Sequence, residues 1–171
     1  MAKKTHLYEW HVERARMGEF ASFSMPLWYE GIIPEHLAVR NAVGVFDVTH
    51  MGRCLVEGKD ALPFLNYVTT NNVRRLKDFQ VQYTLFCNPS GGIKDDLTIC
   101  RLSEEKFLLV YNASNREKDF NWLRENSRSF DVQLRDISDE APMIAVQGPY
   151  AVKVLEKACL LYTSPSPRDR G

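Results

Sequence analysis

The feature that most constrains this 171-residue chain is a tight turn between two strand-like runs. Asn88-Pro89-Ser90-Gly91 fits a β-turn, because proline pre-sets φ at the second position and glycine tolerates a positive φ near the end. Residues 82–87 before the turn are rich in β-forming side chains, and residues 93–102 after it alternate in polarity. The pattern predicts an antiparallel hairpin.

Two adjacent carboxylates, Asp95 and Asp96, open the second strand of this hairpin. Because side chains in a strand point to opposite faces with period two, at most one of the pair can face a given pocket. Asp95 shares a face with Leu97. Asp96 shares the opposite face with Thr98 and Cys100. A carboxylate in this position fits a catalytic or ligand-orienting group, and it also fits a solvated hairpin mouth.

The remainder of the chain predicts short strands mixed with amphipathic helices. Strands outnumber helices and turn signals are frequent, which favours an α+β class with largely antiparallel sheets and flanking helices. Residues 20–29 are interrupted by Pro26 and are expected to be irregular or an edge strand. We expect helices near 7–16, 32–42, 61–68, 116–126 and from 150, and further strands near 45–52, 53–57, 106–111, 132–134 and 143–146.

Composition and spacing argue against several classes of function. Twenty-two basic and 22 acidic side chains give a formal net charge of +0, which does not indicate a nucleic-acid binder. No apolar run approaches the ~20 residues of a membrane span, and no signal sequence is visible, so we expect a cytoplasmic protein without a membrane partner. The four cysteines show no CxxC spacing and the four histidines no HExxH spacing, so neither a metal site nor a disulfide framework is expected.

The last segment, residues 159–171, differs from the rest of the chain. It is a Ser/Pro-rich stretch without a core pattern. The string resembles the translation of a transposase-type sequencing adaptor. We therefore expect the authentic coding sequence to end near Ala158 and residues 159–171 to be an artefact.

Six short motifs, in order, resemble one known family. They are Phe20-Ala21 with Met25-Pro26, and then residues 35–40, 44–52, 91–97, 112–119 and 147–149. From Leu7 to about Leu155 the chain is similar to the N-terminal part of aminomethyltransferase, the T-protein of the glycine cleavage system. Three positions depart from that pattern: Cys100 stands where tyrosine is frequent, and Ser22-Phe23 stands where Gly-Trp is usual.

The resemblance implies a reaction and a fold. The family transfers the one-carbon unit of an aminomethyl-lipoyl carrier, the H-protein, to tetrahydrofolate, and releases ammonia and the reduced lipoyl arm. Its fold surrounds a folate-filled channel. Residues 1–52 plus 140–158 would form an incomplete, discontinuous first domain, and residues 53–139 an inserted ferredoxin-like domain. The chain would be a truncated N-terminal portion, inactive by itself.

The resemblance also assigns site residues. It places the essential acid at Asp96, where a carboxylate can orient the pterin amine and stabilise iminium-like charge as ammonia leaves. Asp95 would keep a structural or polar-rim role. Folate contacts are implied for Met51, Tyr83, Thr98, Val110 and Asn112.

Asp96, Thr98 and Cys100 share one face of their strand, and Val110 and Asn112 share one face of the next. The two sets line one surface if Cys100 pairs with Val110 around a loop centred on Glu105. Each contact residue also has a plainer interpretation. Tyr83, Val110 and Met51 fit ordinary core positions, and Asn112 could merely cap the following helix.

Other functions also stay open. A folate-binding module of a dimethylglycine or sarcosine dehydrogenase, or a sulfoniopropionate demethylase, shares the fold and the channel. A folate-binding iron–sulfur assembly factor of the same superfamily is not a transferase. Composition and periodicity by themselves support only a small-molecule binding module.

Overall fold

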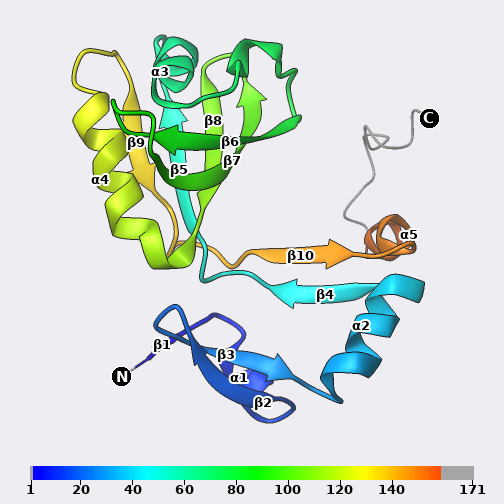
Figure 1. Cartoon of the computed structure of the whole chain (residues 1–171). Coiled ribbons are helices and arrows are strands. Elements are labelled where there is room, and N and C mark those ends of the chain that lie inside the picture. Colours follow the sequence, from blue (N-terminus) through cyan, green and yellow to red (C-terminus); the bar gives the residue numbers. More distant parts are fainter. Residues whose placement is uncertain (1, 159–171) are drawn as a thin grey trace. The chain divides into compact units, whose positions relative to one another are not determined.

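The computed structural model describes residues 2–158, which divide into two compact units (Figure 1). Residues 2–49 and 142–158 form one unit, and His50–Ala141 form the other. These limits lie within a few residues of the predicted divisions at 52/53 and 139/140. That the units are the two predicted domains stays a prediction, and the expected artefact at 159–171 lies outside the described residues.

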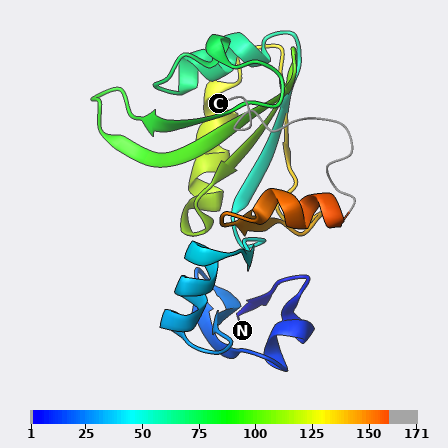
Figure 2. The ribbon, with the colours of Figure 1, turned by 90° about the vertical axis from the view of Figure 1, so that its right-hand side faces the viewer.

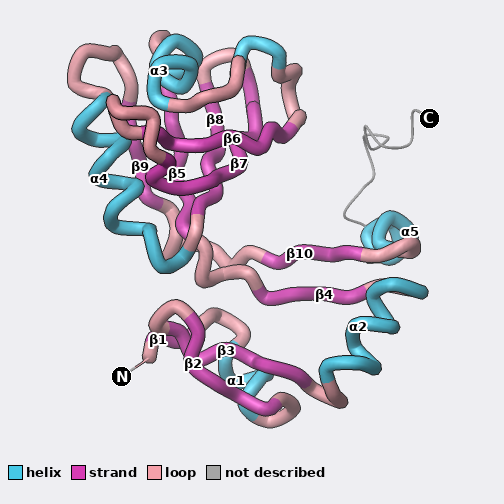
Figure 3. Tube along the Cα trace, viewed as in Figure 1, coloured by secondary structure: helices cyan, strands magenta, loops and turns pink. Residues whose placement is uncertain are grey.

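The first unit contains a three-stranded sheet in the order β1-β3-β2 and a two-stranded antiparallel sheet of β4 and β10 (Figure 3). Its elements are β1 (Lys3–Lys4), α1 (Tyr8–Val12), β2 (Arg16–Phe20), β3 (Phe23–Trp28), α2 (Ile32–Asn41), β4 (Gly44–Asp47), β10 (Ile144–Gln147) and α5 (Ala151–Lys157). The predicted helix at 32–42 is present, with Pro34 in its first turn.

Two predictions for this unit were wrong. The first helix ends at Val12 rather than continuing to residue 16, because the chain from Arg16 pairs with β3 instead. The segment around Pro26 is a continuous strand with neighbours on both sides, although its pairing with β2 shifts register between Arg16 and Met17. It tolerates proline because β1 pairs only with Phe23 and Ser24, so no ladder hydrogen bond from position 26 is needed on that side.

The second unit is built on a five-stranded antiparallel sheet in the order β6-β7-β8-β5-β9. Its elements are β5 (Gly52–Glu57), α3 (Ala61–Val68), η1 (Val73–Arg75), β6 (Val81–Cys87), β7 (Ile93–Ser103), β8 (Lys106–Tyr111), η2 (Ala113–Asn115), α4 (Arg116–Asn126) and β9 (Gln133–Asp136). Without β6, the strands and helices follow the β-α-β-β-α-β order of ferredoxin-like units. The antiparallel α+β class is as predicted.

Helices α3 and α4 pack on the same face of this sheet (Figures 1 and 2). Phe64 and Leu65 from α3 and Leu123 from α4 are fully buried there. They meet alternate residues of the strands, among them Ile99 and Leu109. The opposite face of β6, β7 and β8 carries side chains that are half-buried or exposed. The sheet therefore has one core face and one open face.

The predicted hairpin is present as β6 and β7, joined by the predicted turn. The side-chain oxygen of Asn88 accepts hydrogen bonds from the backbone N–H groups of Ser90 (3.0 Å) and Gly92 (2.8 Å). Gly91 has a φ of +82°, a conformation that glycine adopts without strain. The turn chemistry thus sets where β7 begins, and with it the faces on which Asp95 and Asp96 lie.

The core face can be tested by truncating an aromatic residue of α3. Phe64→Ala removes a fully buried ring, and we expect the free energy of unfolding to fall by about 3–5 kcal/mol. Tyr67→Ala on the same helix removes a ring that is 67% exposed and should cost less than about 1.5 kcal/mol. Urea unfolding followed by circular dichroism measures both. Equal losses would contradict the assignment of the core face.

Candidate functional site

The open face of β6, β7 and β8 carries the predicted site residues. Tyr83 pairs with Thr98, which pairs in turn with Val110, so these three residues form a row across the three strands. Asp96 lies two residues before Thr98 on β7, and Asn112 lies two residues after Val110, just past the end of β8. The predicted division of the two acids between opposite faces is confirmed, because Asp95 is buried and Asp96 is half-buried in an alternating pattern.

The predicted pairing of Cys100 with Val110 is wrong. Cys100 pairs with Leu108, two residues earlier, because Ser103 and Lys106 close a tighter hairpin after an irregularity in β7. A shift of two residues leaves every side chain on its original face, whereas a shift of one would have reversed them. The predicted side chains therefore lie on the same face of the sheet, although the predicted register is wrong.

Asn112 contacts both acids through its amide nitrogen. Nδ2 donates to Oδ1 of Asp95 and to Oδ1 of Asp96, each at 2.9 Å. Because both neighbours are acceptors, the amide nitrogen and not the oxygen must face them. Both N–H groups of the Asn112 amide then donate to the two acids. Its amide oxygen can still accept a hydrogen bond from a ligand.

Tyr83 completes a polar group around Asp96. Partial burial raises the pKa of Tyr83, and the carboxylate of Asp96, which is hydrogen-bonded to the tyrosine hydroxyl, raises it further. The ring is 59% exposed, so Tyr83 is not a core residue. Asn112 makes no side-chain capping bond to the following turn, so its plainer interpretation is also wrong.

The remaining predicted contacts lie nearby on the same sheet. Thr98 and Val110 occupy the neighbouring row and are half-buried. Met51 immediately precedes β5, whose first residue, Gly52, pairs with Tyr111 at the end of β8. Met51 is thus at the end of the sheet where Asn112 follows β8. That these residues contact a folate stays a prediction.

Asp95 does not lie on a polar rim. It is buried on the core face against Asp119, a residue of α4 that is fully buried. Sequence reasoning missed Asp119, although its position four residues before Leu123 places both on one face of the helix. Helical spacing alone could have indicated a carboxylate pointing at the sheet.

The pKa values of the two buried acids move in opposite directions. Burial alone would raise the pKa of Asp95, but hydrogen bonds from Asp119, Asn112 and Asn115 outweigh burial and lower it. Burial raises the pKa of Asp119, and its contact with Asp95 raises it further, to about 8. Asp95 is therefore the charged member of the pair near neutral pH.

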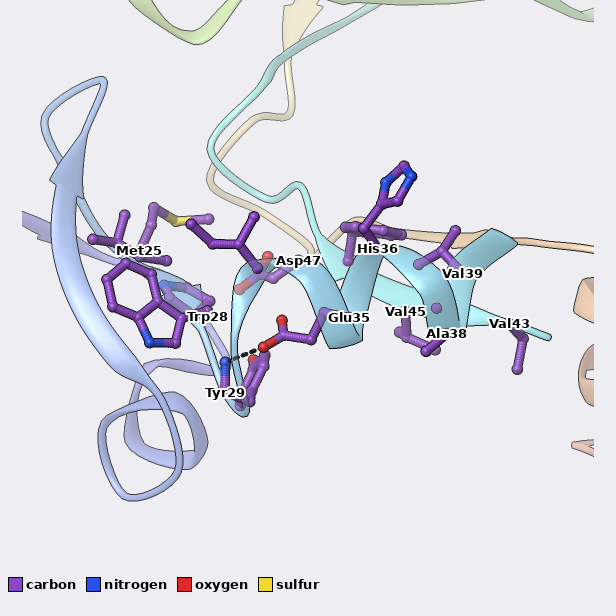
Figure 4. Close-up of a pocket in the computed structure, with 15 residues that line it drawn as sticks. Met25, Trp28, Tyr29, Glu35, His36, Ala38, Val39, Val43, Val45 and Asp47 are labelled. Atoms are coloured by element: carbon purple, nitrogen blue, oxygen red, sulfur yellow. Dashed lines mark hydrogen bonds between the residues drawn. The ribbon is translucent and has the colours of Figure 1, made fainter. Parts of the chain in front are cut away.

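The first unit holds a pocket of about 510 Å³ between β3, α2 and β4 (Figure 4). Its wall is mostly apolar, and Figure 4 shows Glu35 pointing toward the backbone of Tyr29. Glu35 accepts three backbone N–H groups, from Tyr29 (2.6 Å), Glu30 (2.8 Å) and Gly31 (2.9 Å). Burial alone would raise the pKa of Glu35, but these hydrogen bonds outweigh it and lower the pKa. The carboxylate is thus already bound to the backbone of the chain. None of the six predicted site residues lines this pocket.

The buried side chain of His11 forms hydrogen bonds with two residues that line this pocket. Nε2 of His11 is 2.9 Å from Oδ2 of Asp47, and its Nδ1 is 2.7 Å from the hydroxyl of Tyr29. Burial opposes the charge on Asp47, but hydrogen bonds from Thr49 and His11 outweigh it and lower the pKa of Asp47. Sequence reasoning treated His11 as one of four scattered histidines. Its role became visible only when α1 and β4 came together.

Two further observations concern the part of the chain that the structure describes. Within residues 2–158, no three or more His, Cys, Asp or Glu side chains gather in a way that could hold a metal ion. No helix in the same range is long and apolar enough to cross a membrane.

Comparison with known proteins gives one consistent result. Residues 7–165 match the family described as the GCVT N-terminal domain, and the chain therefore belongs to that family. It is 53% identical over 156 residues to the aminomethyltransferase of Thermosipho melanesiensis, covering 91% of this chain and 43% of that protein. The aminomethyltransferase of Thermoanaerobacter pseudethanolicus is 46% identical over 165 residues, which cover 96% of this chain and 44% of the relative.

Solved structures agree with the sequence relatives. The glycine cleavage system aminomethyltransferase T from Bartonella henselae superposes with a TM-score of 0.89 at 40% identity, covering 94% of this chain and 44% of that chain. The heterotetrameric sarcosine oxidase from Corynebacterium sp. U-96 superposes with a TM-score of 0.54 at 16% identity, covering 81% and 67%, which shows a shared fold alone. The chain spans less than half the length of the aminomethyltransferases it matches.

The bridging role of Asn112 can be tested by replacing its amide with a carboxylate. Asn112→Asp turns a double donor into an acceptor between two acids, and we expect the free energy of unfolding at neutral pH to fall by about 2–4 kcal/mol. The loss should shrink as pH falls into the carboxyl range, since protonation restores a donor. Asn121→Asp, the same change at an exposed position of α4, is the control. Urea unfolding that showed equal effects for the two variants would contradict the bridge.

Proposed function

We propose that this chain forms the N-terminal part of a tetrahydrofolate-dependent aminomethyltransferase of the glycine cleavage system. The observation that carries the proposal is the meeting of Asp96, Asn112 and Tyr83 on one open sheet face, in a chain that belongs to the GCVT N-terminal domain family. The relatives named aminomethyltransferase, at 46% and 53% identity, support the same activity.

In this proposal Asp96 is the catalytic group. Its carboxylate accepts a hydrogen bond from Asn112 and contacts Tyr83, so its position is held before any substrate arrives. It would orient the amine of the pterin that attacks the methylene carbon, and it would stabilise positive charge while ammonia leaves and the lipoyl sulfur is released. Met51, Tyr83, Thr98, Val110 and Asn112 would line the folate site.

The proposed substrates and partners follow from the same assignment. Tetrahydrofolate would accept the one-carbon unit, and the lipoylated H-protein would deliver it, in the cytoplasm. The sarcosine oxidase likeness supports the fold only, so it does not favour the alternative of a dehydrogenase module. No observation on this chain favours a demethylase or an iron–sulfur assembly factor over the transferase.

Exposed apolar side chains in the first unit support the proposal that the active enzyme is longer. Helix α2 buries none of its residues, and Ile32 and Ile33 are among the most exposed apolar side chains of residues 2–158. Val45 and Phe46 of β4 are also exposed. Side chains of this kind favour association or coverage by further protein. We expect the 171-residue chain alone to be poorly soluble and to show no tetrahydrofolate-dependent turnover.

The catalytic assignment is tested in a longer version of the chain that includes the C-terminal part present in its relatives. Asp96→Asn should lower turnover by about 10²–10³-fold, because it removes the charge that stabilises the transition state while keeping the size of the side chain. Asp95→Asn should lower turnover much less and thermal stability more, since Asp95 faces the core. Tetrahydrofolate binding by calorimetry and methylene transfer by absorbance measure these effects. Equal loss of turnover in both variants would overturn the assignment.

A further inference from the structure

Asp119 is a buried acid without a hydrogen-bond donor. It is fully buried at the contact of α4 with the sheet, and within the described residues neither side-chain oxygen has a donor in bonding range. The nearest cation, Nζ of Lys118, is 3.9 Å from Oδ1, which is too long for a hydrogen bond. An ionised carboxylate in such a place would be strongly disfavoured, so the neutral acid is the form that fits.

Asp95 supplies the acceptor for that neutral acid. It is buried on the core face of β7, and within the described residues its Oδ2, like both oxygens of Asp119, is buried without a hydrogen-bond partner. Lys118, next to Asp119 on α4, reaches the backbone oxygen of Lys94, next to Asp95 on β7, so the two acids lie at the same contact of helix and sheet. Two carboxyl groups can form a hydrogen bond only through a proton that one of them carries. Because Asp95 already accepts a bond from Asn112, it is the charged member, and Asp119 is the donor.

We propose that Asp95 and Asp119 share one proton between β7 and α4, and that this proton holds Asn112 and, through it, Asp96 in place. Asp119 is therefore a positioning residue, with no contact to substrate required of it. The shared proton rests on the burial of both acids and on three carboxyl oxygens without partners within the described residues, Oδ2 of Asp95 and both oxygens of Asp119, whereas the role of holding Asp96 rests on the proposed function.

The amide of Asn112 is the link between the buried pair and the open face. One of its N–H groups binds Asp95 and the other binds Asp96, at equal distances of 2.9 Å. If Asp119 lost its proton, Asp95 would lose a donor and face a second charge at short range. Asp95 would then either move away from α4 or draw Asn112 toward itself, and in both cases the contact with Asp96 would change.

The other charged groups around the pair do not replace the proton. Lys94 and Lys118 both lower the pKa of Asp119, but burial and Asp95 outweigh them. Lys118 is engaged with the backbone oxygen of Lys94 at 2.6 Å, and Lys94 lies over the ring of Trp122. Tyr111, on the neighbouring strand, is a buried phenol whose pKa is raised by burial, so it stays neutral. Proton sharing is what remains to stabilise two acids in contact.

The sign of the pH dependence follows from the raised pKa of Asp119. Between about pH 4 and about pH 8 the folded chain keeps a proton that the unfolded chain releases, so this pair makes stability fall as pH rises across that window. The lowered pKa of Asp95 acts in the opposite sense at the acid end, where stability is lost as pH falls. Asp119→Asn keeps a donor at every pH and should remove the fall toward pH 8.

The experiment is a carbon-13 NMR titration of the aspartate carboxyl groups, from pH 4 to pH 10, in the longer version of the chain that includes the C-terminal part present in its relatives. We expect one carboxyl to titrate near pH 8 rather than near pH 4, and the side-chain NH₂ signals of Asn112 to shift in step with it. Both changes should vanish in Asp119→Asn and persist in Asp131→Asn, a matched change at an exposed carboxylate paired with Lys59. Thermal unfolding shows that each variant is folded.

The wild-type titration alone can overturn the inference, whatever the variants do. If every aspartate titrates in the ordinary range, no proton is shared. If one titrates near pH 8 but the Asn112 signals do not respond, the positioning role is wrong. In the longer version of the chain, tetrahydrofolate binding should weaken above pH 8 in the wild type and not in Asp119→Asn. A titration as expected together with no folate binding at any pH would refute the proposed function and leave the proton pair standing.

Discussion

The alternation of side chains across β6, β7 and β8 is the constraint on which the rest of the second unit depends. One face meets α3 and α4 and takes the large apolar residues, and the other stays open and collects polar ones. Each strand must keep the same parity, or a buried row would become exposed. The candidate site is therefore a consequence of the core: Asp96 faces outward because Leu97 and Ile99 must face inward.

Asn112 joins the two faces at the end of β8. A side chain in mid-strand could reach only one of the two adjacent acids, but a residue just past the strand can turn its amide to both. The buried carboxyl pair, the amide and the open carboxylate thus form one continuous path from α4 to the open face. Such a path couples the protonation of a core residue to the geometry of a surface group without any moving loop.

The first unit is stabilised differently from the second. Its helix α2 buries no side chain, while a histidine, a tyrosine and an aspartate form hydrogen bonds inside the unit. His11 joins α1 to β4 and to the residue that follows β3. Its buried side chains include Thr5, His11 and Thr49 beside Phe23 and Met25, whereas Ile32 and Ile33 of α2 stay exposed.

The sequence by itself determined the hairpin, its turn, the antiparallel α+β class and the opposite faces of Asp95 and Asp96, because turn chemistry and period-two alternation are local properties. It did not determine the register of β7 with β8, the strand through Pro26 or the burial of Asp95. Those depend on which neighbouring element pairs with or covers each segment. The periodicity of a sequence predicts which side chains share a face, but not which element packs against that face. Only the packing of α4 on the sheet brought Asp119 to Asp95, and so decided that Asp95 lies in the core while Asp96 lies on the open face.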